Sequence, residues 1–181
     1  ALEAGYKILQ PQKAGAEDFI SELNSLCPDL VVVAAFGQIL KPAIVHQWFC
    51  VNLHASVLPH YRGAAPINWA IINGDTETGI TTMKMDKGMD TGDILSTRAI
   101  PIQKTDNSQT LHNKLAQEGA SLVLETIANL ENHSLTPIPQ DASRRGKREA
   151  YLPASEQGTL PRRLNGLNPV HCCGLHHRDM P

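Results

Sequence analysis

The sequence predicts an α/β fold of the Rossmann-like type with a mostly parallel sheet. Residues 30–35 form an unbroken apolar run that includes three valines, a pattern typical of a parallel strand buried on both faces. Short β-branched runs alternate along the chain with segments of helical periodicity, as a fold built from βαβ units requires. The length of 181 residues suits one domain and part of another.

The individual elements follow from apolar periodicity and from helix start and stop signals. A helix over residues 17–26 precedes the valine strand, and Pro42 is well placed to begin a helix that runs through His46. The next predicted elements are a strand at 50–53, a helix at 66–73 that stops at Gly74, strands at 79–85 and 94–102, and a long helix at 108–130. This last helix takes much of its apolar surface from Leu111, Leu115, Leu122, Ile127 and Leu130.

The beginning of the chain departs from a complete doubly wound fold, which opens with a full strand and helix. Residues 1–11 predict the tail of a helix that runs into a short strand. We therefore expect that an N-terminal strand unit of the sheet is missing and that the chain is a fragment.

Composition excludes some classes of protein. A formal net charge of −2 argues against a protein that coats nucleic acid by charge alone. Cys27 and Cys50 stand apart within apolar surroundings, which predicts reduced core thiols, and Cys172 and Cys173 are adjacent and poorly placed to bridge each other. Without an apolar run of about 18 residues or a signal-peptide pattern, a cytoplasmic location is expected.

Two separated motifs carry groups suited to acyl transfer. Asn52 and His54 are two residues apart in a predicted strand, so both side chains point to the same side. Asp90 lies in a Gly-containing segment that could return to this strand and hold the imidazole. Asp86 and Asp93 lie in the same segment, and the residues alone do not decide among the three carboxylates. Taken singly, an Asn or a His is more often a turn or core residue than a catalyst.

Four stretches together resemble the folate-dependent formyltransferase family, from about residue 1 to about residue 151. They are Asn-x-His-x-Ser-x-Leu-Pro at 52–59, Tyr-Arg-Gly-Ala-Ala-Pro-Ile-Asn-Trp-Ala at 61–70, Gly-Ile-Thr-Thr-Met at 79–83, and Met-Asp-Lys-Gly-Met-Asp-Thr-Gly-Asp at 85–93. The resemblance implies a formyltransferase fold and catalytic roles for Asn52, His54 and Asp90. It also implies 10-formyltetrahydrofolate as the formyl donor. No metal ion is expected.

The chemistry implied by the resemblance needs groups that stabilise charge on the formyl oxygen. Asn52 can donate from its amide and a protonated His54 can donate with charge, and one well-placed donor is typically worth about 3 kcal/mol of barrier. A carboxylate beside the imidazole favours its protonated form, and Asp90 could also accept the proton of the amine directly or through water.

Binding residues are expected around these catalytic groups. For the folate the expected residues are Phe36, Gly37, Ile39, Ser56, Val57, Leu58, Pro59, Gly88 and Thr91. Phe36 and Ile39 are almost equally compatible with core packing, and Val57 replaces a leucine of the family motif. Arg62 suits an anionic or phosphate-bearing substrate, although an ion-paired surface arginine is an equal alternative.

The resemblance is strongest to the branch that formylates initiator methionyl-tRNA, which is therefore the leading substrate. A sugar-nucleotide amine is the alternative, because enzymes acting on such amines share the pattern at 62–66. A second alternative is a non-catalytic truncated remnant that folds weakly. The family implies a monomer, and no membrane contact is expected.

Beyond residue 136 the character of the sequence changes, so we divide the chain into a catalytic domain at 1–136, a basic linker at 137–163 and the remnant or disordered start of a C-terminal domain at 164–181. Between Asp141 and Arg163 the sequence contains six basic and three acidic residues. A solvated linker is the simpler interpretation, and a phosphate-contacting segment that includes Arg144 and Arg145 is the alternative. The His and Cys residues at 171–177 lack the two separated ligand pairs typical of zinc sites.

Overall fold

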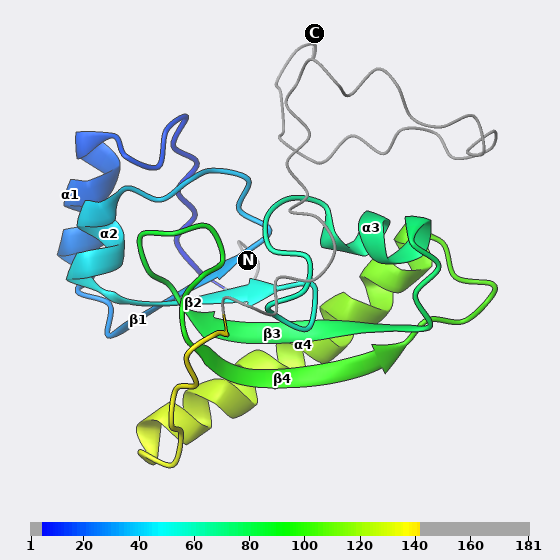
Figure 1. Cartoon of the computed structure of the whole chain (residues 1–181). Coiled ribbons are helices and arrows are strands. Elements are labelled where there is room, and N and C mark those ends of the chain that lie inside the picture. The colour runs from blue at the N-terminus through cyan, green and yellow to red at the C-terminus, as the bar shows by residue number, and fades with distance from the viewer. Residues whose placement is uncertain (1–4, 142–181) are drawn as a thin grey trace, which may run out of the picture.

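The computed structural model describes residues 5–141, which form one four-stranded mixed sheet with helices along one face and at both ends (Figure 1). The elements are α1 (Glu17–Leu26), β1 (Leu30–Ala34), α2 (Pro42–Gln47), β2 (Phe49–His54), α3 (Pro66–Ile72), β3 (Glu77–Lys84), β4 (Ile94–Pro101) and α4 (Ser108–Glu131). Their type and order confirm the predicted α/β class, with boundaries within two residues of those predicted.

The sheet is less parallel than predicted. Its strand order is β1-β2-β3-β4; β1 pairs with β2 in parallel, whereas the β2–β3 and β3–β4 pairs are antiparallel. The connection from β2 to β3 passes through α3, which lies beyond the end of β2 (Figure 1). This helix has seven residues, a length of about 10 Å, and is too short to carry the chain back to the start of β2. The chain therefore enters β3 from that end and runs back along β2.

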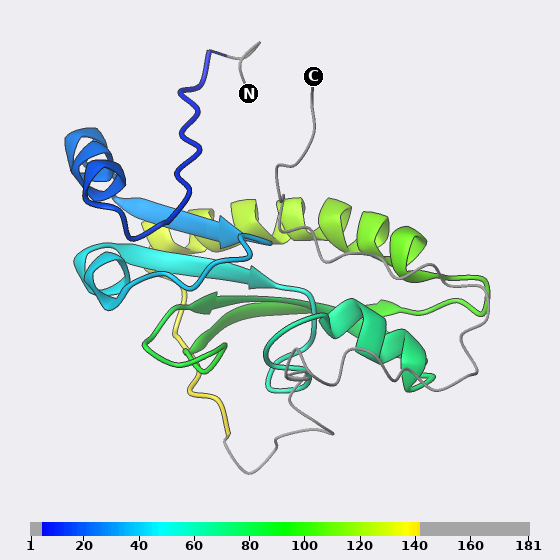
Figure 2. The ribbon, with the colours of Figure 1, turned by 90° about the horizontal axis from the view of Figure 1, so that it is seen from above.

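The long helix α4 covers one face of the sheet (Figure 2). It buries one stripe of side chains, and Leu111, Leu115 and Leu122 pack with Ile80 and Ile100 of the sheet. Thr126, which the apolar pattern did not indicate, is also buried and its hydroxyl lies 2.8 Å from that of Thr82. Ile127 and Leu130, which were predicted to belong to this stripe, are only partly buried.

The contact between β2 and α4 decides which way the site residues face. Leu53 packs against the core under α4, and a Cβ atom on Gly119 would come within 2.7 Å of the Leu53 side chain. Because side chains alternate along a strand, Asn52 and His54 lie on the opposite face of the sheet. The helix thus packs one face and leaves the other for polar groups.

Two expectations about the N-terminal part are wrong. Residues 5–11 form no strand, and Tyr6 and Ile8 are exposed, since no strand of the described chain pairs with the free edge of β1. Cys27 is exposed at the end of α1, whereas Cys50 is buried in β2 as predicted. Burial raises the pKa of the Cys50 thiol, which favours its protonated form.

No helix within residues 5–141 is long and apolar enough to span a bilayer.

The first turn of α4 is fixed by polar side chains. Asn107 and Thr110 form a reciprocal capping box, and the Asp106 carboxylate accepts hydrogen bonds from Lys114 at 2.7 Å and from the Gln103 amide at 2.7 Å. The Lys114 ammonium is the main cause that lowers the pKa of Asp106, followed by the Gln103 amide.

Core packing under α4 is expected to dominate stability. Leu122→Ala should lower the free energy of unfolding by about 2–5 kcal/mol, because Leu122 is 1% exposed and its loss leaves a cavity. Leu124→Ala, two positions along the same helix and 69% exposed, should change it by less than about 0.5 kcal/mol. Urea unfolding followed by circular dichroism measures both, and equal effects would contradict the assignment of the buried face.

The lowered pKa of Asp106 predicts a pH-dependent contribution to stability. The ionised carboxylate stabilises the fold at pH values above its ordinary pKa of about 3.9, and this contribution is lost as the pH falls through the lower folded pKa. Asp106→Asn should therefore lower the melting temperature at pH 7, and the difference from the unmodified chain should shrink steadily below about pH 4. A difference independent of pH would argue against a role for the charge.

Candidate active site

Three polar side chains from two separate segments meet on the face of the sheet opposite α4. The Nδ2 atom of Asn52 donates to Oδ1 of Asp90 at 3.3 Å, and Nδ1 of His54 lies 3.6 Å from Oδ2 of the same carboxylate. The Asp90 Oδ2 atom also accepts a hydrogen bond from the backbone amide of Gly63 at 2.8 Å. One carboxylate thus joins β2, the loop after β2 and the loop between β3 and β4.

The antiparallel pairing of β2 and β3 brings Asp90 to this place. Lys84, the last residue of β3, pairs with Val51 near the start of β2, so the following loop begins beside the strand that carries Asn52 and His54. The loop then turns back over the sheet face, with Asp90 in the left-handed backbone region at φ 52°. Such a conformation is uncommon for an aspartate and costs roughly 1 kcal/mol or more unless surrounding contacts hold it.

Gly92 lies at a close approach between the loop and the end of β3. In the structure, a Cβ atom at this position would lie 1.7 Å from the Lys84 carbonyl oxygen. Gly92 therefore allows the loop to pack against the end of β3.

The structure separates Asp90 from the two competing carboxylates. Asp86 accepts hydrogen bonds from the Gly88 amide at 2.9 Å and from the Thr91 hydroxyl at 2.8 Å. Asp93 contributes its backbone oxygen to Lys84. Asp86 thus fixes the loop and occupies Thr91, while Asp90 is the carboxylate that faces the imidazole.

His54 has acceptors on both sides of its ring. Its Nε2 atom lies 2.8 Å from the backbone oxygen of Tyr61, its Nδ1 atom faces Asp90, and the residue is 7% exposed. The Nε2 atom is therefore engaged with the Tyr61 backbone oxygen, while the Nδ1 atom is directed toward the Asp90 carboxylate without a hydrogen bond to it.

The side chain of Tyr61 points toward α3 and away from the imidazole. Its hydroxyl donates to Asp75 at 2.5 Å and accepts from the Asn73 amide at 2.8 Å. Burial is the main cause that raises the pKa of Tyr61, and the Asp75 carboxylate adds to it. This anchored tyrosine holds its own carbonyl oxygen against His54.

The loop at 55–60 is fixed by buried hydrogen bonds. The Thr81 hydroxyl donates to the Ser56 carbonyl oxygen at 2.7 Å and accepts from the Leu58 amide at 3.1 Å. Ser56 is 0% exposed and its hydroxyl donates to the His60 backbone oxygen. The side chains of Ser56 and Leu58, both predicted to bind folate, are therefore enclosed and shape the loop, whereas Val57 and Pro59 are partly exposed.

The loop after β1 places its predicted binding residues at the surface. Phe36 is 40% exposed, Ile39 is 85% exposed, and Gly37 has a positive φ of 69°. The alternative of core packing for Phe36 and Ile39 is wrong within the described chain. Their role in binding folate stays a prediction, as do those of Gly88 and Thr91.

Arg62 is buried rather than ion-paired at the surface, which corrects one of the two sequence-based interpretations. It is 7% exposed, and its Nε and Nη2 atoms donate to Oε1 of Gln140 at 2.9 and 2.7 Å. Gln140 had no motif around it and was missed at the level of sequence. Arg144 and Arg145 lie outside the described residues, as do the tail at 164–181 and its His and Cys residues.

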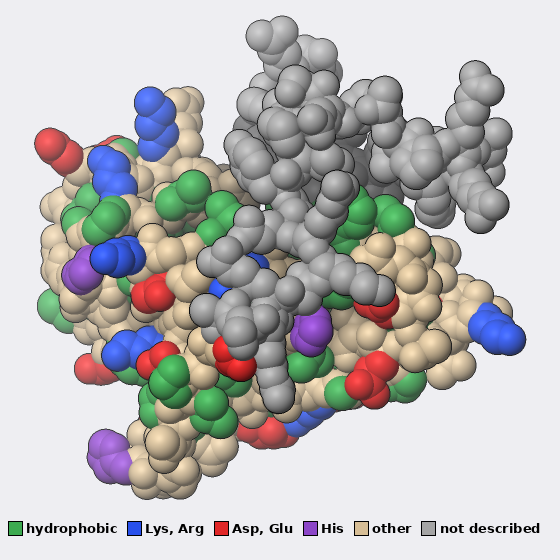
Figure 3. Space-filling view, viewed as in Figure 1, with side chains coloured by type: hydrophobic (Ala, Val, Ile, Leu, Met, Phe, Trp, Pro, Cys, Tyr) green, Lys and Arg blue, Asp and Glu red, His purple; other side chains and the backbone are tan. Residues whose placement is uncertain are grey.

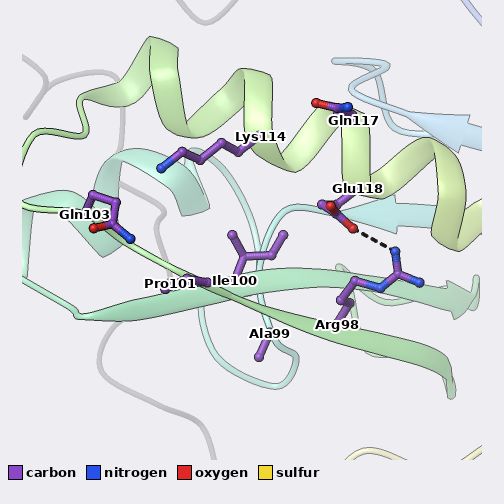
Figure 4. Close-up of a pocket in the computed structure, with 8 residues that line it drawn as sticks. All are labelled: Arg98, Ala99, Ile100, Pro101, Gln103, Lys114, Gln117 and Glu118. Atoms are coloured by element: carbon purple, nitrogen blue, oxygen red, sulfur yellow. Dashed lines mark hydrogen bonds and ion pairs between the residues drawn. The ribbon is translucent and has the colours of Figure 1, made fainter.

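A separate hollow lies between β4 and α4, on the side of the sheet away from these residues (Figure 4). Its volume is about 380 Å³, and its lining includes Arg98, Gln103 and Lys114. Arg98 is engaged with Glu118 at 2.8 Å and with Glu125 at 2.6 Å. Within residues 5–141, no group of three His, Cys, Asp or Glu residues is placed to hold a metal ion.

The chain belongs to the formyl transferase family, whose model matches residues 2–127. The methionyl-tRNA formyltransferase of Caldanaerobacter subterraneus subsp. tengcongensis is 53% identical over 143 residues, covering 77% of this chain and 46% of that protein. The methionyl-tRNA formyltransferase of Geobacter metallireducens is 50% identical, with coverages of 78% and 46%. The family predicted from the motifs is confirmed, and the chain spans about half the length of these relatives.

Solved structures support the same fold. A phosphoribosylglycinamide formyltransferase from Bacillus halodurans superimposes with a TM-score of 0.58 at 30% identity, covering 62% of this chain and 59% of that one. A structure described as a likely sugar N-formyltransferase from Mycobacterium tuberculosis has a TM-score of 0.62 at 26% identity, with coverages of 80% and 62%.

The buried hydroxyl of Thr81 is expected to maintain the loop beside the site. Thr81→Val keeps the shape of the side chain but leaves the Leu58 amide and the Ser56 carbonyl without this partner, which should cost about 1–3 kcal/mol. Thr97→Val is the matched control, because Thr97 is the exposed cross-strand partner of Thr81. Denaturant unfolding compares the two, and an equal loss of stability in both variants would exclude a special role for Thr81.

Proposed function

We propose that this chain carries the catalytic site of an enzyme that transfers a formyl group from 10-formyltetrahydrofolate to the amino group of initiator methionyl-tRNA. The observation that carries the proposal is the contact of the Asp90 carboxylate with both Asn52 and His54. Membership of the formyl transferase family supports the reaction, and the similarity to methionyl-tRNA formyltransferases supports the acceptor.

The site residues have complementary roles in the proposed reaction. The amine nitrogen attacks the formyl carbon, a new C–N bond forms, and charge gathers on the formyl oxygen. Asn52 uses one amide hydrogen on Asp90 and keeps a second for that oxygen. The Nδ1 atom of His54 lies 3.6 Å from Asp90, beyond hydrogen-bond distance, so in the protonated ring its N–H can turn to an oxygen placed beside the carboxylate.

Asp90 is the proton acceptor in this proposal. The amine must lose a proton as the new C–N bond forms, and the folate N10 must gain one as its bond to the formyl carbon breaks. The carboxylate lies next to both oxygen-stabilising groups and can accept the first proton directly or through water. A proton held there is available for return to N10.

The residues proposed to contact the tRNA lie outside the described part of the chain. On the face shown in Figure 3, basic and acidic side chains of the described part are interspersed. Contact with tRNA phosphates is assigned to the basic segment that includes Arg144 and Arg145, where the sequence has its highest density of basic residues. The proposal is completed by a monomer that acts in the cytoplasm without a metal ion.

Substitution of the three residues tests the proposed chemistry. Asn52→Ala, His54→Ala and Asp90→Asn should each lower the rate of formyl transfer by roughly 10²–10³, since each removes a group that stabilises the transition state or moves a proton. The assay uses mass spectrometry of formyl-methionine on initiator tRNA. A parallel reaction offers a 4-amino sugar nucleotide as the acceptor.

Asp93→Asn is the matched control, because Asp93 lies three positions from Asp90 and contributes its backbone oxygen. This variant should stay within about threefold of the unmodified chain. Product from the sugar nucleotide alone would replace the proposed acceptor, and no product from either amine would refute catalysis by this chain.

A further inference from the structure

Gln140 lies where the chain leaves the sheet after α4. Two residues earlier, Ile138 forms an antiparallel bridge with Ile94 at the start of β4, with hydrogen bonds of 2.8 Å in both directions. This bridge places the Gln140 side chain between the loop that carries Arg62 and the loop that carries Asp90. The bridge therefore fixes the backbone just before Gln140, from which the side chain extends.

The amide of Gln140 uses its full hydrogen-bonding capacity on these two loops. Its Nε2 atom donates to the backbone oxygens of Asp90 at 3.0 Å and Gly92 at 2.7 Å. Its Oε1 atom accepts both hydrogen bonds from the Arg62 guanidinium. Two donors and one acceptor on a single side chain are a combination that only an amide supplies.

These bonds act on a backbone that needs support. Asp90 has a left-handed conformation, and Gln140 holds its carbonyl oxygen while the Gly63 amide holds its carboxylate. Gly63 directly follows Arg62, so the two loops are linked twice, once through Gln140 and once through Asp90 itself. Loss of the first link leaves the carboxylate held by the Gly63 amide and by Asn52, with its own backbone oxygen released.

We propose that Gln140 is a positioning residue, which fixes the Asp90 carboxylate against Asn52 and His54 by tying the Asp90–Gly92 backbone to buried Arg62. This inference rests on the proposed function. Gln140 does not touch the reacting atoms. Its contribution is to hold the proton acceptor in productive geometry, where a displacement of about 1 Å can cost roughly a hundredfold in rate.

Two variants distinguish the donors of Gln140 from its acceptor. Gln140→Met keeps a similar length and removes all the hydrogen bonds. Gln140→Glu keeps an acceptor for Arg62 but replaces the donors with a carboxylate that faces two carbonyl oxygens. Gln117→Met is the control, because Gln117 is an exposed glutamine on α4.

Amide hydrogen exchange of the full chain is measured first. In both Gln140 variants, exchange should become roughly tenfold faster at Gly63 and at 88–92, corresponding to about 1.4 kcal/mol of local protection, and should be unchanged in β3 and α4. The control should match the unmodified chain throughout. Unchanged exchange at Gly63, or faster exchange over the whole sheet, would overturn the positioning role.

Kinetics of formyl transfer are measured on the same proteins. Both Gln140 variants should lose roughly tenfold to a hundredfold in kcat, with KM for folate and for the amine within about threefold. A change in KM alone would overturn the inference. If the unmodified chain forms no product, the proposed function fails, and the exchange measurement still decides whether Gln140 positions Asp90.

Discussion

The carboxylate of Asp90 is the contact on which the proposed site depends. It accepts hydrogen bonds from Asn52 on β2 and from the Gly63 amide, and it faces the imidazole of His54. Three stretches of chain therefore meet at one anionic group. Because its backbone is in the left-handed region, Asp90 stays there only while neighbouring groups restrain it.

Because side chains alternate along β2, the residue that packs in the core and the residues of the proposed site lie on opposite faces of the sheet. Leu53 faces α4 and joins the apolar core, while its neighbours Asn52 and His54 face the other way. A polar site can therefore lie one residue from the apolar core, on the opposite face of the sheet, where its buried polar groups are partnered by one another. Loops cover this face, and they are held by hydrogen bonds to the side chains of Thr81 and Gln140.

Much of the fold could be predicted from local sequence. Helix starts at Pro42 and Pro66 and the valine strand were correctly placed because each depends on a few neighbouring residues. The prediction of a mostly parallel sheet was confirmed only in part, because the direction of β3 depends on where the connecting helix lies in space. Similarly, the burial of Ser56 and of Arg62 depends on partners 25 and 78 residues away.

The sequence by itself determined the order of elements, the family, and the side chains that could do the chemistry, because motifs and periodicity are local properties of the chain. The tertiary structure decided which of three nearby carboxylates faces His54, since the alternatives differ only in where a loop folds back. It also decided the place of Gln140, an unremarkable residue in sequence that acquires a role only when two distant loops meet around its amide.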